Sequence, residues 1–211
     1  AFITRGMDAV IIEPKANHTA SVIFLHGLGD SGQGWAPVAS QFARKSPHVR
    51  WILPNAPFQP VTLNGGMRMP SWHDIKSLAS IDAEDYKGLD ESKELVEKVI
   101  QAEIDSGIES DRIILAGFSQ GAGLSVFTGM QFGKQLAGVV CLSGYLPYNG
   151  DFSKVITANQ TTPVLVCHGE ADQVVNPKAG AKCHETLKAA GVPAEFHSFP
   201  GLAHGSAEEE L

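Results

Sequence analysis

The stretch that decides the fold is "RIILAGFSQGAG", which runs from Arg112 to Gly123. Its first part is an apolar run typical of a buried strand, and its second part consists of small residues that begin a helix. Where the two meet, residues 117–121 match the pattern G-x-S-x-G, in which a Ser occupies a strained strand-to-helix turn. The stretch therefore predicts that Ser119 is a nucleophile exposed above the carboxyl edge of a sheet. The alternative is a Gly/Ser turn that merely packs a helix on a strand.

Strand and helix patterns alternate along the rest of the chain. Apolar runs typical of strands occupy residues 8–14, 20–27, 49–57, 112–118, 137–144, 163–169 and 194–199, and helical patterns occupy residues 34–45, 89–104, 120–132 and 177–191. Such alternation predicts a mainly parallel sheet with helices on both faces, in one α/β domain spanning residues 1–211. The final "HGSAEEEL" opens a further helical pattern, and we expect this last helix to be truncated.

A serine hydroxyl needs a base to take its proton and a carboxylate to orient that base. In hydrolases with this strand–Ser–helix turn, the carboxylate follows the Ser in the chain and the His comes last. The strand and turn "VLVCHGEADQVV" provide two candidates for the acid. We prefer Asp172, because the turn after Gly169 leaves it further round the loop, and Glu170 is the alternative.

His204 is the candidate base. It lies late in the chain, in the small-residue loop "FPGLAHGSA" that follows the last predicted strand. His26 and His168 each precede a Gly at a strand end, where a core histidine bonded to the backbone is the usual role. His184 on a helix flank and His197 within a strand are expected to be solvated or structural.

The turn "HGLGDSGQGW", from His26 to Trp35, permits two interpretations. Its Gly spacing is that of a dinucleotide-binding loop, which would indicate an NAD(P)-binding oxidoreductase. That function requires an acidic residue about 20 positions further on, at the end of the next strand, and the strand at 49–57 ends in Pro54 and Asn55 without one. The other interpretation is a turn that supplies a backbone amide to an oxyanion, as in serine esterases, and we adopt it.

The composition excludes several partners. The 211 residues carry a formal net charge of −7, so a nucleic-acid backbone or an anionic membrane surface would be repelled. No apolar run approaches about 18 residues, and we expect no stable membrane insertion. The three cysteines are an odd number without metal-ligand spacing, which favours a reducing, cytoplasmic location and a protein with no metal and no organic cofactor.

Taken together, the motifs carry a family resemblance. "FLHGLGDSGQGW", "PNAPFQPVTLNGGMRMPSWHDI", "DRIILAGFSQGAGLS", "LSGYLP", "CHGEADQVV" and "PGLAH" follow one another over nearly the whole chain. In this order they resemble the acyl-protein thioesterase, lysophospholipase and carboxylesterase family of the α/β-hydrolases. The resemblance implies an α/β-hydrolase fold without a cap domain, and a triad of Ser119, Asp172 and His204. It also implies an oxyanion hole made by the backbone amides of Leu28 and Gln120.

The same resemblance implies a lid loop near residues 58–80 that covers an acyl channel. The loop is rich in Gly and Pro yet holds five apolar side chains where polar ones are usual, namely Leu63, Met67, Met69, Trp72 and Leu78. Exposed apolar loops often bind apolar ligands, although each of these side chains could instead plug the rim of the core. His73 stands where the family usually has an aromatic residue, so we expect a more polar or shorter channel mouth.

The predicted function is that of a serine hydrolase that cleaves acyl thioesters or esters through an acyl-enzyme. Protein S-depalmitoylation is the first expectation, and a lysophospholipase or a short-chain carboxylesterase or deacetylase is the alternative. A hydrolase fold that acts only as a ligand receptor is disfavoured because all three triad positions are occupied. The expected partners are acylated proteins or lipid and ester small molecules, and the expected state is a monomer or a weak homodimer.

Overall fold

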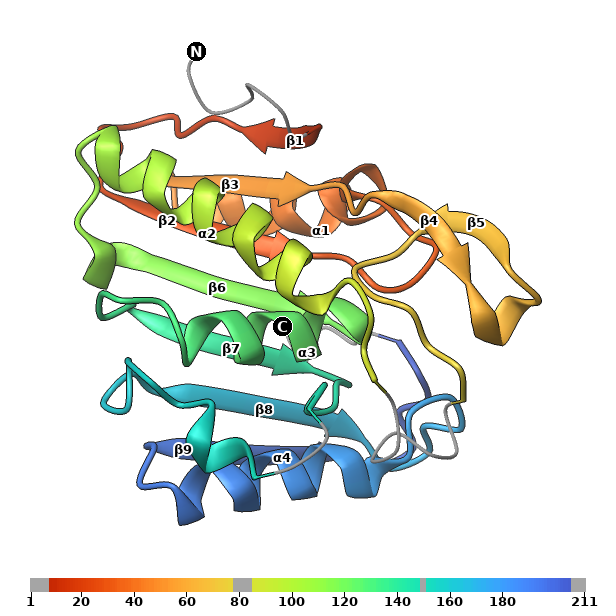
Figure 1. Ribbon diagram of the computed structural model, residues 1–211. Helices are drawn as coiled ribbons and strands as arrows, with labels where there is room; N and C mark the ends of the chain where they lie inside the picture. Colours follow the sequence, from red (N-terminus) through yellow and green to blue (C-terminus); the bar gives the residue numbers. More distant parts are fainter. Residues whose placement is uncertain (1–7, 78–84, 149–150, 206–211) are drawn as a thin grey trace.

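A seven-stranded sheet forms the centre of the molecule in the computed structural model, which describes residues 8–77, 85–148 and 151–205 (Figure 1). The strands lie in the order β1-β3-β2-β6-β7-β8-β9. Their bounds are β1 Ala9–Ile12, β2 Ala20–Leu25, β3 Val49–Pro54, β6 Ile113–Phe118, β7 Gly138–Leu142, β8 Val164–Gly169 and β9 Ala194–Phe199. Every neighbouring pair is parallel except β1 with β3, so the predicted, mainly parallel sheet is confirmed.

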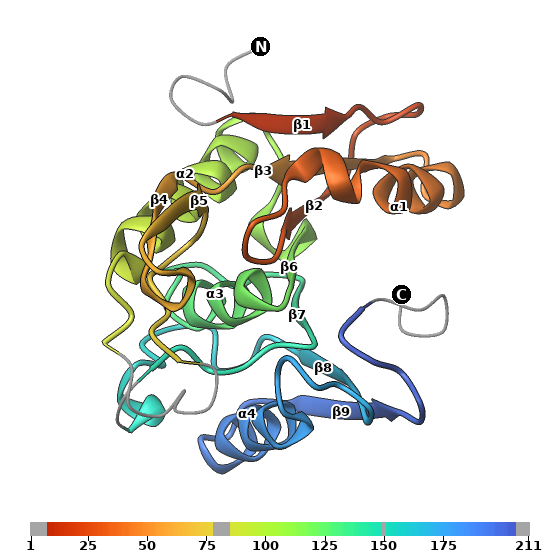
Figure 2. The same ribbon diagram turned by 90° about the vertical axis from the view of Figure 1, so that its right-hand side faces the viewer.

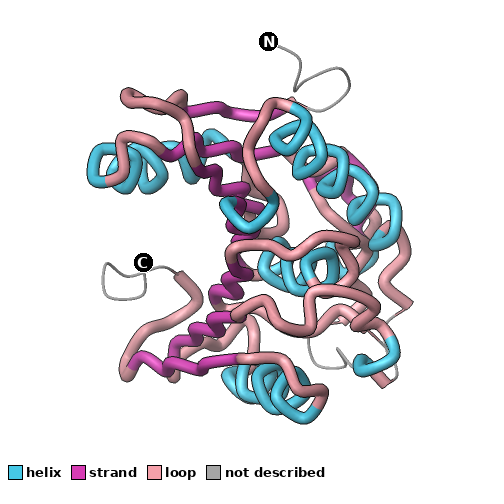
Figure 3. The backbone as a smooth tube through the Cα atoms, turned by 90° about the vertical axis from the view of Figure 1, so that its left-hand side faces the viewer, coloured by secondary structure: helices cyan, strands magenta, loops and turns pink. Residues whose placement is uncertain are grey.

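Four helices cover the two faces of this sheet. They are α1 (Gly32–Lys45), α2 (Leu89–Asp105), α3 (Gln120–Gly129) and α4 (Pro177–Ala189). Figures 2 and 3 show α1 on one face and the other three helices on the opposite face. The predicted helices on both faces are thereby confirmed. Within the described ranges, no helix combines the length and the apolar content that crossing a membrane requires.

Local sequence explains where these helices begin and how they pack. Ser31 accepts a hydrogen bond from the amide of Gly34 and starts α1, and Asn176 caps α4 ahead of Pro177. A side-chain oxygen before the helix and a Pro at its first position are the usual signals of a helix start. All ten residues of α3 are buried, as expected of a helix whose composition is small and apolar all round. This central helix follows Ser119 directly.

The arrangement of strands brings the predicted site residues to one edge. Because neighbouring parallel strands end on the same side, the segments after β2, β6, β8 and β9 all lie at the carboxyl edge, onto which Figure 2 looks. Residues 206–211, on which the truncated helix was expected, lie outside the described residues.

The segment expected to be a lid loop contains a β-hairpin instead. Strands β4 (Phe58–Val61) and β5 (Met67–Pro70) pair antiparallel across a short 3₁₀ helix, Thr62–Asn64, and two turn glycines with φ of 65° and 80°. The hairpin projects from the carboxyl edge of the main sheet (Figure 1). The two strands have only four residues each and contain Pro60 and Pro70, and Pro normally argues against a strand. The hairpin is therefore hidden in the sequence.

Candidate active site

Ser119 occupies a sharp turn between β6 and α3. Its backbone has φ 54° and ψ −118°, a conformation that L-residues rarely adopt. The flanking glycines make this turn possible. A Cβ at Gly117 would lie 2.4 Å from the carbonyl of Gly121, and a Cβ at Gly121 would lie 2.3 Å from the carbonyl oxygen of Leu25. Backbone atoms cannot yield to such contacts, so only Gly fits at either position.

His204 reaches Ser119 from the loop after β9. Its Nε2 lies 3.0 Å from the Ser119 hydroxyl oxygen, and its Nδ1 lies 2.7 Å from Oδ2 of Asp172. A carboxylate only accepts hydrogen bonds, so Nδ1 carries the proton and Nε2 is left to accept one from the hydroxyl. The ring of Phe118 packs against the imidazole, with 4.9 Å between the centroids. The fold thus connects the three predicted triad residues in one chain of hydrogen bonds.

Asp172 is held in the turn after β8. Its Oδ1 accepts hydrogen bonds from the amides of Val174, at 2.8 Å, and Val175, at 2.9 Å. Its side chain is fully buried, whereas the alternative acid, Glu170, is exposed and accepts a hydrogen bond from the Ser198 hydroxyl. The geometry therefore favours Asp172 over Glu170 as the partner of the base.

The remaining histidines occupy the positions expected of structural residues. His26 donates from Nδ1 to the carbonyl of Gly27 and accepts at Nε2 from the amide of Ala56. Burial lowers the pKa of His26. His168 bonds to the carbonyl of Val175, as predicted for a core histidine, but it also lies 3.2 Å from Asp172. The second contact was not predicted, since only the fold brings the strand end and the turn together.

The turn predicted to supply an oxyanion amide lies beside the nucleophile. A Cβ at Gly27 would lie 3.4 Å from Cβ of Ser119. The amide of Gly29 donates to the carbonyl of Pro70 at 2.9 Å, which ties the far side of the turn to the hairpin. Leu28, between these two glycines, is partly buried against the core.

The side chain of Gln120 links the start of α3 to the segment after the hairpin. Its Oε1 accepts from the amide of Trp72 at 2.8 Å, and its Nε2 donates to the carbonyl of His73, also at 2.8 Å. The indole of Trp72 in turn donates to the carbonyl of His26 at 2.8 Å. Residues 70–73 therefore bond to both segments that carry the predicted oxyanion donors. We call residues 70–73 the brace.

The predicted lid residues fall into two groups. Leu63 and Met67 on the hairpin are exposed to 39% and 64%, and Phe58 on the same hairpin is exposed to 64%. Met69 is half-buried, and its Sδ lies 3.8 Å from where a Cβ on Gly29 would stand. Trp72 differs from the expectation for a lid, because it is fully buried in the core cluster. Leu78 lies outside the described residues.

His73 does not contribute to an exposed channel mouth. The ring is fully buried, and its Nε2 lies 2.9 Å from the hydroxyl of Tyr145. Its Nδ1 has no hydrogen-bond partner among the described residues. Burial lowers the pKa of His73 to about 3, and the nearby charge of Asp74 offsets only part of this shift. The expected polar mouth is therefore wrong: the ring is part of the core beneath the hairpin.

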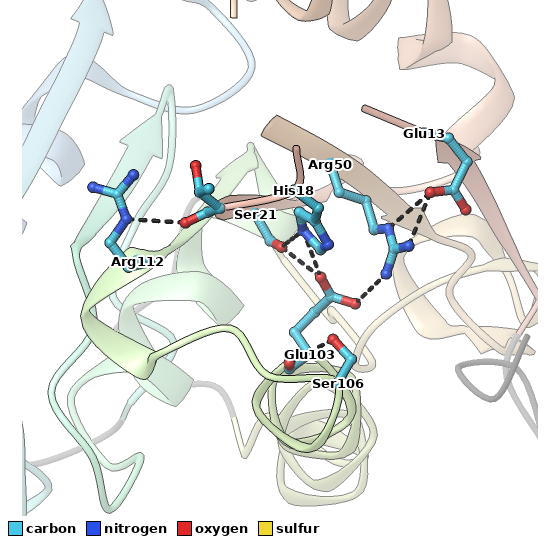
Figure 4. A network of polar contacts seen from close by, with 8 residues as sticks. Glu13, His18, Ser21, Arg50, Glu103, Ser106 and Arg112 are labelled. Carbon is cyan, nitrogen blue, oxygen red and sulfur yellow. Dashed lines mark hydrogen bonds and ion pairs between the residues drawn. The ribbon is translucent and has the colours of Figure 1, made fainter. Parts of the chain in front are cut away.

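A second group of Ser, His and carboxylate lies at the opposite, amino edge of the sheet (Figure 4). The Ser21 hydroxyl donates to the buried Glu103, and Nε2 of His18 lies 2.9 Å from the same hydroxyl. Arg50 binds Glu103 at 3.1 Å and Glu13 at 2.9 Å. We call Ser21, His18, Glu103 and Arg50 the amino-edge cluster. Burial, followed by the nearby Arg50 charge, lowers the pKa of His18.

Comparison with known proteins places the chain in a family. The Phospholipase/Carboxylesterase family matches residues 7–211. Acyl-protein thioesterase 1 homolog 1 of Dictyostelium discoideum is 47% identical over 207 residues, covering 97% of this chain and 91% of that protein. Acyl-protein thioesterase 1 of Yarrowia lipolytica is 46% identical over 212 residues, covering 96% of this chain and 92% of that protein.

Solved structures agree with this placement. The crystal structure of Zea mays acyl-protein thioesterase 2 has a TM-score of 0.84 at 32% identity, covering 96% of this chain and 94% of that chain. The crystal structure of Arabidopsis thaliana SOBER1 also has a TM-score of 0.84, at 34% identity, covering 91% and 93%. The family resemblance of the sequence motifs and the predicted fold are confirmed. This chain belongs to the Phospholipase/Carboxylesterase family of ester and thioester hydrolases and has the α/β-hydrolase fold.

Proposed function

We propose that this protein hydrolyses acyl thioesters of S-palmitoylated proteins, with Ser119, His204 and Asp172 as its catalytic triad. One observation carries the mechanism: Ser119 bonds Nε2 of His204 at 3.0 Å while Asp172 bonds Nδ1 at 2.7 Å. This connection leaves Nε2 free to take the hydroxyl proton. The substrate class is supported by relatives that are named acyl-protein thioesterases and are more than 40% identical to this chain.

The first half-reaction forms an acyl-enzyme. Oγ of Ser119 attacks the thioester carbonyl carbon, and its proton passes to Nε2 of His204. The C–S bond then breaks as Nε2 returns that proton to the departing thiolate. Asp172 keeps the proton on Nδ1 and stabilises the imidazolium. The amides of Leu28 and Gln120 are the proposed donors to the oxyanion, each worth about 2.7–4 kcal/mol of barrier.

The second half-reaction releases the fatty acid. Water attacks the acyl carbon while Nε2 of His204 takes its proton. The C–Oγ bond breaks as that proton passes to Oγ, which regenerates Ser119 and frees the carboxylic acid. The hairpin carries three exposed apolar side chains, Phe58, Leu63 and Met67, which are the proposed contacts of a long acyl chain. None of the three cysteines is part of a disulfide, which supports the proposal of a reducing, cytoplasmic setting.

Fluorophosphonate labelling tests the nucleophile. Wild-type protein should react with the probe, whereas Ser119→Ala should not react and should lose esterase activity. Ser21→Ala is the matched control, because Ser21 also touches a histidine and a carboxylate. This variant should be labelled like the wild type. Equal labelling of Ser119→Ala and the wild type would refute the mechanism.

Two further assays test the substrate class. Rates on p-nitrophenyl esters should stay high from butyrate to palmitate, and an S-palmitoylated peptide should release its free thiol. A rate that is high on acetate and collapses on longer chains would instead establish a short-chain carboxylesterase. Release of fatty acid from lysophosphatidylcholine, but not from the peptide, would establish a lysophospholipase.

A further inference from the structure

We propose that His168 is a positioning residue for this reaction: a permanently neutral N–H donor that holds the Asp172 carboxylate in the orientation from which it binds His204. The inference rests on the proposed roles of Asp172 and His204. His168 stands at the end of β8, four residues before Asp172. Its Nε2 lies 3.2 Å from Oδ2 of Asp172, the same oxygen that binds Nδ1 of His204 at 2.7 Å.

The surroundings of His168 determine which nitrogen carries its proton. Nε2 faces two acceptors, the carboxylate of Asp172 and the carbonyl of Val175 at 3.0 Å. Nδ1 has no hydrogen-bond partner among the described residues. A lone N–H buried at Nδ1, facing away from both acceptors, would lose the bond to Val175 and the contact with Asp172 and gain none. The proton therefore resides on Nε2, which donates to the carbonyl of Val175 and faces Oδ2 of Asp172 at 3.2 Å.

Packing keeps the ring in place and without charge. The His168 side chain is fully buried, and a Cβ added at Gly180 of α4 would lie only 2.5 Å from its Nδ1. The titratable groups that act on the ring are Asp172 and, beyond it, His204. Burial lowers the pKa of His168 despite the nearby carboxylate. The residue thus remains a donor rather than becoming a second counter-charge for Asp172.

His168 completes the hydrogen bonding of Asp172. An ionised carboxylate offers about four acceptor positions. Val174 and Val175 donate to Oδ1 and His204 donates to Oδ2, while Nε2 of His168 lies 3.2 Å from Oδ2 at the remaining acceptor position. Without His168, Oδ2 keeps only His204 as a neighbouring donor, so this end of the carboxylate is held less firmly. Its charge is then shared with fewer donors and stabilises the protonated form of His204 more strongly.

Substitutions of His168 test this role in steady-state kinetics on a short ester across pH. His168→Phe keeps an aromatic ring but removes the donor, and His168→Gln restores an N–H near the position of Nε2. We expect His168→Phe to lower kcat about 10–100-fold, as for outer-shell partners of other sites, with KM nearly unchanged. The acid side of its pH–rate profile should move to higher pH, and His168→Gln should recover most of both effects. His184→Phe, a half-buried histidine on α4 that stacks on Phe196, is the control for loss of a histidine.

The measurement distinguishes positioning from packing. Rates are referred to active sites counted with the fluorophosphonate probe, so misfolded protein does not contribute. If His168→Phe lowers only the melting temperature, with kcat per active site and the pH–rate profile unchanged, the proposal is overturned. If Ser119→Ala keeps its activity, the proposed function fails instead, whatever the His168 variants do.

A second measurement needs no variant. Nitrogen-15 NMR of histidine in the wild-type protein should show His168 as the neutral Nε2–H tautomer, unchanged across the pH range in which activity appears. A proton on Nδ1 of His168, or titration of His168 together with activity, would overturn the proposal even if every variant failed to fold.

Discussion

At the carboxyl edge of the sheet, Ser119 and Asp172 bind different nitrogens of His204, whereas at the amino edge Ser21 and Glu103 both lie against the same nitrogen of His18. The two sites contain the same three chemical groups. In the first, the imidazole stands between hydroxyl and carboxylate. In the amino-edge cluster the hydroxyl donates directly to the carboxylate, so Nε2 of His18 has to donate to the hydroxyl oxygen and cannot accept its proton.

The second difference lies in the charge around the carboxylate. Asp172 is surrounded by N–H donors without formal charge, apart from His204, which becomes charged in the proposed reaction. Glu103 is already neutralised by Arg50, and has no uncompensated charge with which to stabilise an imidazolium. The comparison shows that connectivity and local charge, rather than the presence of Ser, His and a carboxylate, separate a catalytic arrangement from a structural one.

The largest effect is expected from Asp172→Asn. An amide at this position presents an N–H or a weaker acceptor to Nδ1 of His204 and favours the wrong tautomer, with the proton facing Ser119. We expect kcat to fall about 10⁴-fold, as for the corresponding change in other triads, while the melting temperature changes little. Glu170→Gln, the alternative acid on the same turn, is the control and should keep full activity. If Asp172→Asn lowered kcat only modestly, and Glu170→Gln lowered it by the same factor, the assignment of Asp172 as the acid of the triad would be contradicted.

At the opposite edge, Glu103→Gln should affect stability and not catalysis. The substitution leaves Arg50, whose side chain is 18% exposed, with only the exposed Glu13 as an anionic partner. Removing one member of a buried ion pair costs about 3–5 kcal/mol of unfolding free energy. Because Arg50 keeps Glu13 as a partner, we expect a loss of about 3 kcal/mol. Urea unfolding measures the loss, and kcat per active site should be unchanged. A loss of turnover without a loss of stability would mean that the amino-edge cluster has a chemical role.

Per pH unit, the smallest effect is expected for a third pair, His73 and Tyr145, in which no carboxylate of the described residues binds the ring. The pKa of His73 is about 3 in the folded protein and about 6.5 when unfolded. Between these values the unfolded chain binds more protons, so stability falls as pH decreases from about 6.5 toward 3, by up to about 1.4 kcal/mol per pH unit.

The check on this pair is His73→Phe. The variant lacks the titration, so its unfolding free energy should depend less steeply on pH in this window, although it loses about 1 kcal/mol at all pH values with the Tyr145 hydrogen bond. Urea unfolding at several pH values measures both slopes. Identical slopes for variant and wild type would show that His73 is not the group responsible.

Much of the site could be predicted from the sequence because its main parts are local. The strand-to-helix turn around Ser119 depends on Gly117 and Gly121, because nearby backbone atoms leave no room for a side chain at either position. The preference for Asp172 over Glu170 followed from how far the turn carries each residue, and the structure buries the first and exposes the second. The strand and helix pattern was equally clear, since the central strands β2, β6, β7 and β8 are largely buried and form nearly continuous apolar runs.

The rest depends on how turns and segments fold against one another. From the sequence, Trp72 is predicted to be an apolar lid residue. In the structure its amide donates to Gln120 and its indole donates to the carbonyl of His26, and these bonds hold it in the core. The contact of His168 with Asp172 requires the turn to fold back on the strand, and no local pattern encodes it. The hairpin was missed because its prolines and short strands resemble a loop.

The brace connects the hairpin to the segments of the proposed oxyanion donors, so a change in the brace itself is expected to affect rate and substrate preference together. Residues 70–73 support the hairpin that carries the exposed apolar side chains, and through Gly29, His26 and Gln120 they also fix the segments that carry the proposed oxyanion donors. A substitution of the buried Trp72 is therefore expected to shift those amides and slow every substrate. Under the proposed function, Leu63 and Met67, which are exposed at the tip of the hairpin, are the positions at which a substitution is expected to change substrate preference with little loss of turnover.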